Sequence, residues 1–286
     1  MRIGLIGLGR MGKNHLNELS KNENFKEILL YDIAKSQDFA YPFYENLDEF
    51  LEQNLDLLII ASPTNTHFDL AKKAFSKVKN ILIEKPLALN LTQMKELDEL
   101  SKTLQINVGV GFSERFNPVI KALKQALKDE KIISINIQRY SSYPQRITDV
   151  GVLQDLAVHD LDLLAFLSQS EFKQSKVFKG FAHSQQREDD SIIACELENC
   201  IGVVHESWNA SYKKRQISVI CEDNSYEANL NDFILLKNLN PLEFNDKTSP
   251  LRAEHEAFLS FAKNDFSPLA RIKDAIRVQE LLEDMR

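Results

Sequence analysis

The first residues of the chain constrain its fold more than any other stretch. Residues 2–6 (RIGLI) are apolar after Arg2 and typical of a buried strand, and they lead into the pattern G-x-G-x-x-G at residues 7–12. Asp32 stands twenty residues beyond that pattern, at the end of a second apolar stretch over 27–32. A strand, a glycine turn, a helix, a second strand and a carboxylate, in this order, are the fingerprint of a dinucleotide-binding unit.

Each glycine of the pattern has its own role. Gly7 permits the tight turn, Gly9 lets the backbone approach a pyrophosphate, and Gly12 lets the helix pack closely on the sheet. The N-terminus of the following helix offers unpaired N–H groups to the phosphates. The sequence therefore predicts a cofactor site at the first turn of the chain.

The identity of the cofactor depends on Asp32. Its carboxylate can accept hydrogen bonds from ribose hydroxyls and would repel a 2′-phosphate, so we expect NAD rather than NADP. Arg10 and Lys35 lie close enough in sequence to leave NADP open. The residues expected at the cofactor are Gly7, Gly9, Arg10, Met11, Gly12, Asp32, Ser62, Pro63, Asn65, His67, Glu84 and Lys85.

Short strands and helices alternate through residues 1–117, which we assign to an NAD-binding Rossmann domain with a doubly wound parallel sheet. Thr92 is the expected N-cap of its last helix. Further strands are predicted at 56–62, 80–84 and 106–112, and helices at 11–20, 47–53, 66–77 and 92–104.

Residues 118–286 follow a different pattern, which predicts a second, α+β domain. A helix, a strand and the helix at 151–167 come first, and successive alternating strands follow from residue 172. Such strands are typical of a mostly antiparallel sheet with one open or partner-covered face. Two helices close the chain at about 252–263 and 271–285.

Composition excludes several classes of protein. The net charge of −7 and the absence of a basic stripe argue against nucleic-acid binding. Three cysteines without a C-x-x-C pair indicate reduced thiols in a cytoplasmic protein, and we predict no metal site. The apolar start is broken at once by glycines, so we expect neither a signal peptide nor a membrane span.

The segment TDVGVLQDLAVHDLDLLAFL at 148–167 is predicted to be one helix with two different faces. Leucines form a core stripe, and Asp155, His159 and Asp162 lie on the opposite side. Asp155 and His159 are four residues apart, so the carboxylate can hold the imidazole in one tautomer beside a proton-transfer site. The alternative is a solvated face with an incidental charge pair. Asp160 falls near the apolar stripe, where it would pair with a cation from elsewhere.

Polar residues also follow the strands at the edge where a doubly wound sheet binds ligands. Lys85 comes directly after a buried strand and before a rigid proline, where it can hydrogen-bond a substrate hydroxyl. His67 lies near a similar strand end, although it could equally belong to the first turn of a helix.

Four segments, GLGRMG, SPTNTH, EKP and the D-x-x-x-H helix, resemble in this order the glucose-fructose oxidoreductase / inositol dehydrogenase / MocA family. The resemblance implies a two-domain NAD(P)-dependent oxidoreductase of sugars or cyclitols, whose second domain forms the floor of the substrate site and often mediates oligomerisation. It carries the catalytic roles to Lys85, Asp155 and His159, and it implies a cis Lys85–Pro86 bond.

Further segments are similar to the branch that includes UDP-N-acetylglucosamine 3-dehydrogenases, which oxidise the sugar C3 hydroxyl for a partner aminotransferase. These are GFSERFNP, SYPQRITDVG, PLRAEHEAFLSF and the helix opening TDVGVLQDLAVHDLD, where the glycine-rich start typical of the family is reduced to Gly151.

The expected reaction is hydride transfer from a sugar carbinol to NAD⁺. His159 would take the hydroxyl proton, Lys85 would stabilise the charge developing on that oxygen, and Asp155 would orient the histidine or the substrate. The residues expected at the substrate, with arginines for a diphosphate, are Arg115, Asn117, Tyr143, Arg146, Asp155 and His159.

Two alternatives stay open: an inositol or other free-sugar dehydrogenase of the same family, and a non-catalytic NAD-binding sensor or regulator. In either case we expect a homodimer or homotetramer, because the second sheet has an exposed face.

Overall fold

The chain is described by a computed structural model that covers residues 1–35, 37–145, 147 and 150–285. It forms two compact units, which we call the first and the second unit. The first unit contains Met1–Ser113 and Leu251–Arg277, and the second contains Glu114–Pro250 and the chain from Val278 onward. Among the described residues, no helix has the length and apolar character needed to cross a membrane.

The first unit is built on a seven-stranded sheet in the order β15-β6-β5-β4-β1-β2-β3. Its strands pair in parallel, apart from β15, which runs antiparallel to β6. The order reverses between β1 and β4, and such a switch point is where doubly wound sheets bind their ligands. The strands are β1 (Arg2–Ile6), β2 (Glu27–Tyr31), β3 (Phe43–Tyr44), β4 (Leu57–Ile60), β5 (Asn80–Glu84), β6 (Asn107–Gly111) and β15 (Ala270–Arg271).

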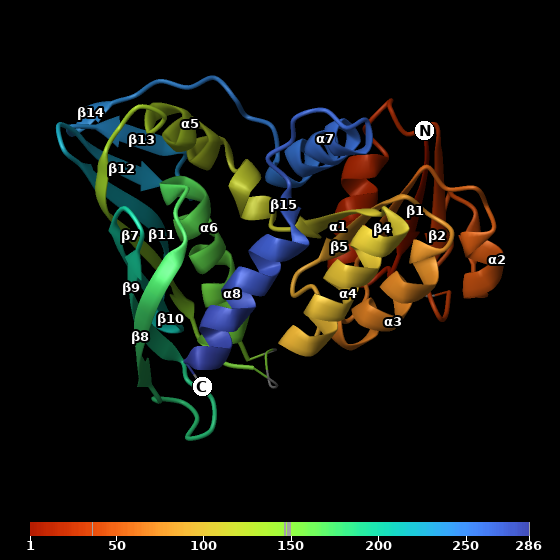
Figure 1. The fold of residues 1–286 in the computed structure, drawn as a ribbon, viewed down its shortest axis with the longest axis horizontal. Helices are drawn as coiled ribbons and strands as arrows, with labels where there is room; N and C mark the ends of the chain where they lie inside the picture. Colours follow the sequence, from red (N-terminus) through yellow and green to blue (C-terminus); the bar gives the residue numbers. More distant parts are fainter. Residues whose placement is uncertain (36, 146, 148–149, 286) are drawn as a thin grey trace. The chain divides into compact units, whose positions relative to one another are not determined.

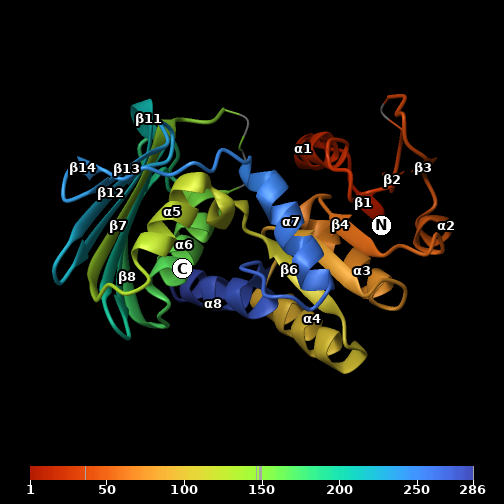
Figure 2. The same ribbon diagram turned by 90° about the horizontal axis from the view of Figure 1, so that it is seen from above.

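Helices cover both faces of this sheet, with α1 and α7 on one face and α3 and α4 on the other (Figures 1 and 2). Every side chain of β4 is fully buried, as the continuous apolar sequence predicted. The predicted Rossmann architecture is therefore confirmed. The helices are α1 (Arg10–Leu19), α2 (Leu47–Leu51), α3 (Thr64–Phe75), α4 (Leu91–Leu104) and α7 (Pro250–Ala262).

Two details differ from expectation. Leu251–Arg277 was assigned to the second domain, yet it packs with the first unit, because β15 pairs with β6 and His255 of α7 lies against His15 of α1. Asn90, not Thr92, caps α4, because the helix begins at Leu91 and the Asn90 side chain accepts the Gln93 N–H.

The second unit contains an eight-stranded sheet in the order β14-β13-β12-β11-β7-β10-β9-β8. All neighbours are antiparallel except β7 and β10, so the predicted mostly antiparallel α+β domain is confirmed. The strands are β7 (Ile132–Ser142), β8 (Phe172–Gly180), β9 (Asp190–Leu197), β10 (Ile201–Ser207), β11 (Asn209–Cys221), β12 (Ser225–Asn229), β13 (Ile234–Lys237) and β14 (Asn240–Pro241).

One face of this sheet is covered by α5 (Pro118–Ala126) and α6 (Val158–Ser168), as Figures 1 and 2 show. Along β9 the side chains alternate, with Ile193 buried beneath the helices and Ile192 exposed on the opposite face. A 3-10 turn (Ser113–Phe116) precedes α5, and α8 (Ile272–Asp284) ends the chain.

The predicted helix over 151–167 has a different form. Leu153–Ala157 is a π-helix, and α6 continues from Val158. Almost every side chain of α6 is buried, including Asp160, which was expected near the apolar stripe, and Asp162, which was expected on the opposite side. The reason is that both aspartates are paired with arginines of the same unit, which lets a charged face be buried.

Candidate active site

A cavity of about 660 Å³ lies at the switch point of the first sheet. It is bounded by the glycine turn, the end of β2, the end of β4 and one face of α3. From the expected cofactor residues it gathers Gly7, Gly9, Arg10, Asp32, Ser62, Pro63 and Asn65.

The glycine turn is shaped to admit a phosphate group. Gly7 has a φ of +90°, and a Cβ there would lie 2.6 Å from the Ser62 nitrogen. A Cβ on Gly12 would lie 1.9 Å from the Gly7 carbonyl oxygen. At Gly9, by contrast, a Cβ would meet nothing within 4 Å, so the backbone borders open space. These observations fit a dinucleotide pyrophosphate at the start of α1.

Asp32 fixes the glycine turn from the end of β2. Its Oδ2 accepts the Leu8 N–H at 2.7 Å, and its Oδ1 accepts the Ile33 N–H at 2.7 Å. The carboxylate still lines the cavity. Lys35 pairs with Asp38 at 2.7 Å and is not part of the cavity lining, whereas Arg10 is.

One face of α3 lines the cavity without having been predicted to do so. Thr66, Asp69, Leu70 and Lys73 follow helical spacing from the predicted Asn65. That spacing of three and four residues was the available signal, because such residues share one helix face. The end of β2 adds Tyr31 and Ile33 to the lining.

His67 is a buried link between two strand ends. Its Nε2 lies 2.8 Å from the Ser62 carbonyl oxygen, and its Nδ1 lies 2.9 Å from the Pro86 carbonyl oxygen. Ser62 lines the cavity, and Pro86 belongs to the turn after β5. His67 therefore ties that turn to the cavity wall, although the imidazole itself does not line the cavity.

The turn after β5 holds the expected catalytic lysine. The Lys85–Pro86 bond is cis, as the family resemblance implied. Glu84 is nearly buried, and its carboxylate accepts the Lys85 N–H and contacts the His15 Nε2. Of the expected cofactor residues, Glu84, Lys85, Met11 and Gly12 do not line the cavity itself. Within the described ranges, no group of three or more potential ligands could hold a metal ion.

In the second unit, Asp155 and His159 are both half-buried and stand on either side of the junction between the π-helix and α6. The start of this segment is held by Glu188. The Val152 N–H donates to its carbonyl oxygen at 3.0 Å, and the Leu153 N–H donates to its Oε1 at 3.2 Å. Nothing in the sequence pattern pointed to Glu188, because it lies on a remote loop.

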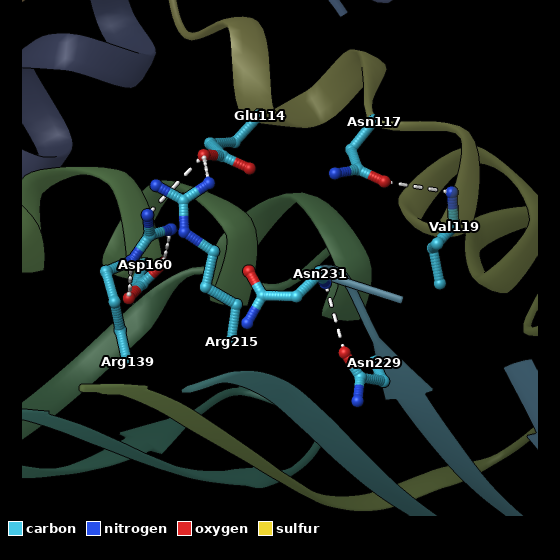
Figure 3. A network of polar contacts seen from close by, with 8 residues as sticks. All are labelled: Glu114, Asn117, Val119, Arg139, Asp160, Arg215, Asn229 and Asn231. Atoms are coloured by element: carbon cyan, nitrogen blue, oxygen red, sulfur yellow. Dashed lines mark hydrogen bonds and ion pairs between the residues drawn. The ribbon is translucent and has the colours of Figure 1, made fainter. Parts of the chain in front are cut away.

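Asp160 pairs with Arg139, the cation that the sequence alone did not identify. The Arg139 guanidinium donates to both its oxygens, at 2.7 and 2.5 Å. Glu114 accepts from Arg139 at 3.4 Å and from Arg215 at 2.8 Å, so one carboxylate joins two arginines of adjacent strands (Figure 3). Arg215 ends the basic run at residues 213–215.

Two of the residues expected at the substrate have partners within the protein. Arg115 is 6% exposed and donates to Asp162 through two nitrogens, at 2.7 and 2.5 Å. Asn117 is buried and caps α5, with its Oδ1 accepting the Val119 N–H (Figure 3). Both side chains are therefore held in place by neighbouring helices. Tyr143 is half-buried against Trp208 and His183. Arg146 lies outside the described residues.

Glu206 of β10 lies beside Arg139 in the sheet register and is fully buried. Ser191 donates to its Oε2 at 2.9 Å, and its Oε1 has no hydrogen-bond partner among the described residues. Burial, reinforced by the negative charge of Asp160, raises the pKa of Glu206 well above its usual range. Burial beneath α6 therefore favours the neutral form of the Glu206 carboxyl.

We expect Glu206→Gln to flatten part of the pH dependence of stability. From the unfolded-state pKa of about 4.3 up to the raised folded-state pKa, the folded chain keeps a proton that the unfolded chain releases. Stability therefore falls as the pH rises across this window. Urea denaturation at several pH values should show a smaller fall in the variant. Glu196→Gln, on the exposed side of β9, is the matched control. An unchanged slope in Glu206→Gln would contradict the assignment.

Comparison with known proteins matches both units. Residues 1–112 match the profile described as oxidoreductase family, NAD-binding Rossmann fold, and residues 130–227 match the GFO/IDH/MocA C-terminal domain. Glucose-6-phosphate 3-dehydrogenase of Bacillus subtilis is 23% identical, over 99% of this chain and 94% of its own. Myo-inositol 2-dehydrogenase of Thermotoga maritima is 29% identical, over 61% and 57%.

Among solved structures, UDP-N-acetylglucosamine 3-dehydrogenase of Acidithiobacillus ferrooxidans superposes with a TM-score of 0.89. The match is 22% identical and covers 100% of this chain and 96% of that one. At this identity the likeness shows a shared fold.

Proposed function

Because the chain belongs to the Gfo/Idh/MocA family of oxidoreductases with an NAD-binding Rossmann fold, we propose that it oxidises a sugar carbinol with NAD⁺. The proposed substrate is a nucleotide sugar such as UDP-N-acetylglucosamine, attacked at its C3 hydroxyl. The second candidate is an inositol or other free-sugar dehydrogenase, which the likeness to the inositol enzyme supports.

The observation that carries the proposal is the placement of the Lys85 turn. His67 bonds the turn at Pro86 and the cavity wall at Ser62, so the expected catalytic lysine is fixed relative to the cofactor cavity. A lysine on a turn tied to the ligand edge of a doubly wound sheet supports the proposal that it acts on a hydroxyl beside the bound cofactor.

When bound, NAD⁺ supplies the acceptor for the hydride that leaves the carbinol carbon. The proposed role of Lys85 is to donate a hydrogen bond to the hydroxyl oxygen and so stabilise its developing negative charge. His159 takes the hydroxyl proton as general base, and Asp155 orients His159 or the substrate. Ser62, Pro63, Asn65 and the glycine turn hold the dinucleotide.

Two relatives support oxidation at C3 of a phosphate-bearing sugar. The Bacillus subtilis protein is named for glucose-6-phosphate and the Acidithiobacillus ferrooxidans protein for UDP-N-acetylglucosamine, and both names specify a 3-dehydrogenase. The diphosphate contacts of a nucleotide sugar are proposed for Tyr143 and Arg146. They are also proposed for Arg115 and Asn117, whose side chains in addition contact Asp162 and cap α5.

The test is turnover with NAD⁺ on a panel of UDP-N-acetylglucosamine, UDP-glucose, glucose 6-phosphate, glucose and inositol. Reduced cofactor is followed by absorbance, and product mass is checked for the loss of two hydrogens. Turnover of the nucleotide sugar alone supports the first proposal, and turnover of inositol or free sugars alone supports the second. Bound NAD with no turnover of any substrate would favour a sensor or regulator and overturn both.

Asp32 is proposed to make the enzyme prefer NAD over NADP. We expect Asp32→Ser to weaken NADH binding by about ten- to a hundredfold, because a hydrogen bond to a charged group contributes about 1.5–3 kcal/mol. Binding of NADPH should weaken less, since the repulsion of its 2′-phosphate is lost. Fluorescence titration measures both, with Asp38→Ser as the control on the exposed neighbour. Equal weakening of both cofactors would refute the assignment.

We also propose a cytoplasmic homo-oligomer that works with an aminotransferase. The face of the second sheet opposite its helices carries exposed apolar side chains, among them Phe178 and Ile192, which are cross-strand partners, and Ile201 and Ile220. Such a face supports association between copies. All three cysteines are free thiols, which is compatible with a reducing compartment.

A further inference from the structure

In the first unit, a row of hydrogen-bonded, buried ionisable side chains leads to the Lys85 turn. It begins at His255, which is far from Lys85 in the sequence. His255 of α7 and His15 of α1 are both fully buried, and Nε2 of His255 lies 2.8 Å from Nδ1 of His15. Nε2 of His15 lies 2.9 Å from Oε1 of Glu84. The other oxygen of Glu84 accepts the Lys85 N–H at 3.1 Å.

The contacts determine where the protons lie. The carboxylate of Glu84 accepts on both oxygens, so His15 carries a proton on Nε2. Nδ1 of His255 is buried and has no hydrogen-bond partner among the described residues. A buried N–H without an acceptor is rarer than a lone pair without a donor, so the His255 proton belongs on Nε2, from which it is donated to Nδ1 of His15.

Every donor in the chain therefore points toward Glu84. His255 donates to His15, His15 donates to Glu84, and the Lys85 N–H donates to the same carboxylate. Hydrogen bonds aligned in this way polarise one another in a buried site. Burial, together with the neighbouring His15, lowers the pKa of His255 well below its usual range, which agrees with a neutral imidazole.

The sheet also makes room for this carboxylate. Glu84 pairs with Gly111 in the register of β5 and β6. A Cβ on Gly111 would lie 2.9 Å from the carboxylate carbon of Glu84, and 3.0 and 3.1 Å from its oxygens. The Glu84 carboxylate is thus confined by hydrogen bonds on two sides and by the strand β6 on a third.

We propose that His255 and His15 are positioning residues, which hold Glu84 so that Glu84 fixes the backbone of Lys85 for the reaction. The inference rests on the proposed function, in which Lys85 acts on the substrate hydroxyl. It deepens that function by assigning a role to α7, a helix that follows the whole strand region of the second unit in sequence. Burying three ionisable side chains costs more free energy than burying apolar side chains of similar size. A core with a purely structural role would have no reason to keep them.

The primary test is hydrogen exchange of the Lys85 amide, which requires no substrate. We expect His255→Leu to speed this exchange by about three- to tenfold, because Glu84 loses its support. His255→Gln should restore slow exchange, since the glutamine amide can donate from nearly the same place as Nε2. His255→Asn, too short to reach His15, serves as a second loss variant if His255→Leu folds poorly.

The control is Phe25→Leu. Phe25 packs edge-on against His255, with ring centroids 6.3 Å apart, and its apolar side chain cannot join the hydrogen bonds from His255 to Glu84. It should lower the melting temperature without changing Lys85 exchange. If His255→Leu and Phe25→Leu behave alike, or if the Lys85 amide exchanges at the wild-type rate in His255→Leu, the histidines are ordinary core residues and the proposal is overturned.

Steady-state turnover is the second measurement. We expect His255→Leu to lower kcat by about ten- to a hundredfold, with the substrate KM and the Kd for NADH near their wild-type values, and His255→Gln to recover most of kcat. Unchanged kcat in a variant with fast Lys85 exchange would also overturn the proposal. A Lys85→Met variant that keeps turnover would instead overturn the proposed function. The exchange measurement would still report whether His255 supports Glu84.

Discussion

Lys85→Met is expected to lose most turnover while retaining the cofactor. The variant keeps an unbranched side chain one atom shorter and removes its charge, so the developing negative charge on the substrate oxygen loses its hydrogen-bond donor. Loss of one such donor lowers kcat by about 10²–10³-fold. Lys85 does not line the cofactor cavity, so the Kd for NADH should stay near its wild-type value. Steady-state kinetics and fluorescence titration measure the two effects separately.

Lys77→Met is the matched control for this variant. Lys77 belongs to the same unit and forms an exposed ion pair with Glu52, remote from the turn after β5. Its kcat should equal that of the wild type. Wild-type turnover in Lys85→Met would remove the lysine from the mechanism, and loss of NADH binding would show that it acts on the cofactor instead.

Arg139→Met is expected to destabilise the protein more than any other single change in the Figure 3 network. Arg139 and Asp160 are both buried, and the arginine donates to both oxygens of the carboxylate. Removing the arginine leaves Asp160 as an uncompensated buried charge, which costs about 3–5 kcal/mol. The free energy of unfolding from urea denaturation gives the loss directly.

Arg215→Met tests the same network from its exposed end. The Arg215 side chain is 43% exposed and shares Glu114 with Arg139, so its loss should cost less than about 1 kcal/mol. The double variant Arg139→Met/Asp160→Leu should recover part of the stability, because it removes both charges. Equal costs for the two arginine variants, or no recovery in the double variant, would contradict the role of burial.

The first unit was more predictable from sequence than the second. Residues 2–6, the glycine turn and Asp32 are close in sequence, and their local pattern determines how they meet, so the cavity contains most of the residues expected there. The strand β4 was recognisable because a strand covered on both faces needs only apolar residues. By contrast, β15 is two residues long, and no local pattern marks a strand that short.

The chemistry beneath α6 was not predictable for a different reason. Helical periodicity places Asp160 and Asp162 around the axis but gives no information about partners from other elements. Their arginines, at positions 139 and 115, come from a strand and a 3-10 turn. The π-helix likewise has no periodic signature, and without it a regular helix was the natural expectation. Long-range pairing of charges is decided by tertiary structure.

The interruption of the first unit has a consequence for synthesis on the ribosome. A nascent chain that has emerged only as far as Pro250 carries β6 with one unpaired edge and His15 without His255. An unpaired strand edge is a template for association with other chains. Domains generally fold as units in the order in which they are made, but here the strands of the second unit are all made before β15 and most of α7. The first unit is therefore begun first but completed only after the strands of the second unit have been made, shortly before Val278 and the residues after it are added to the second unit.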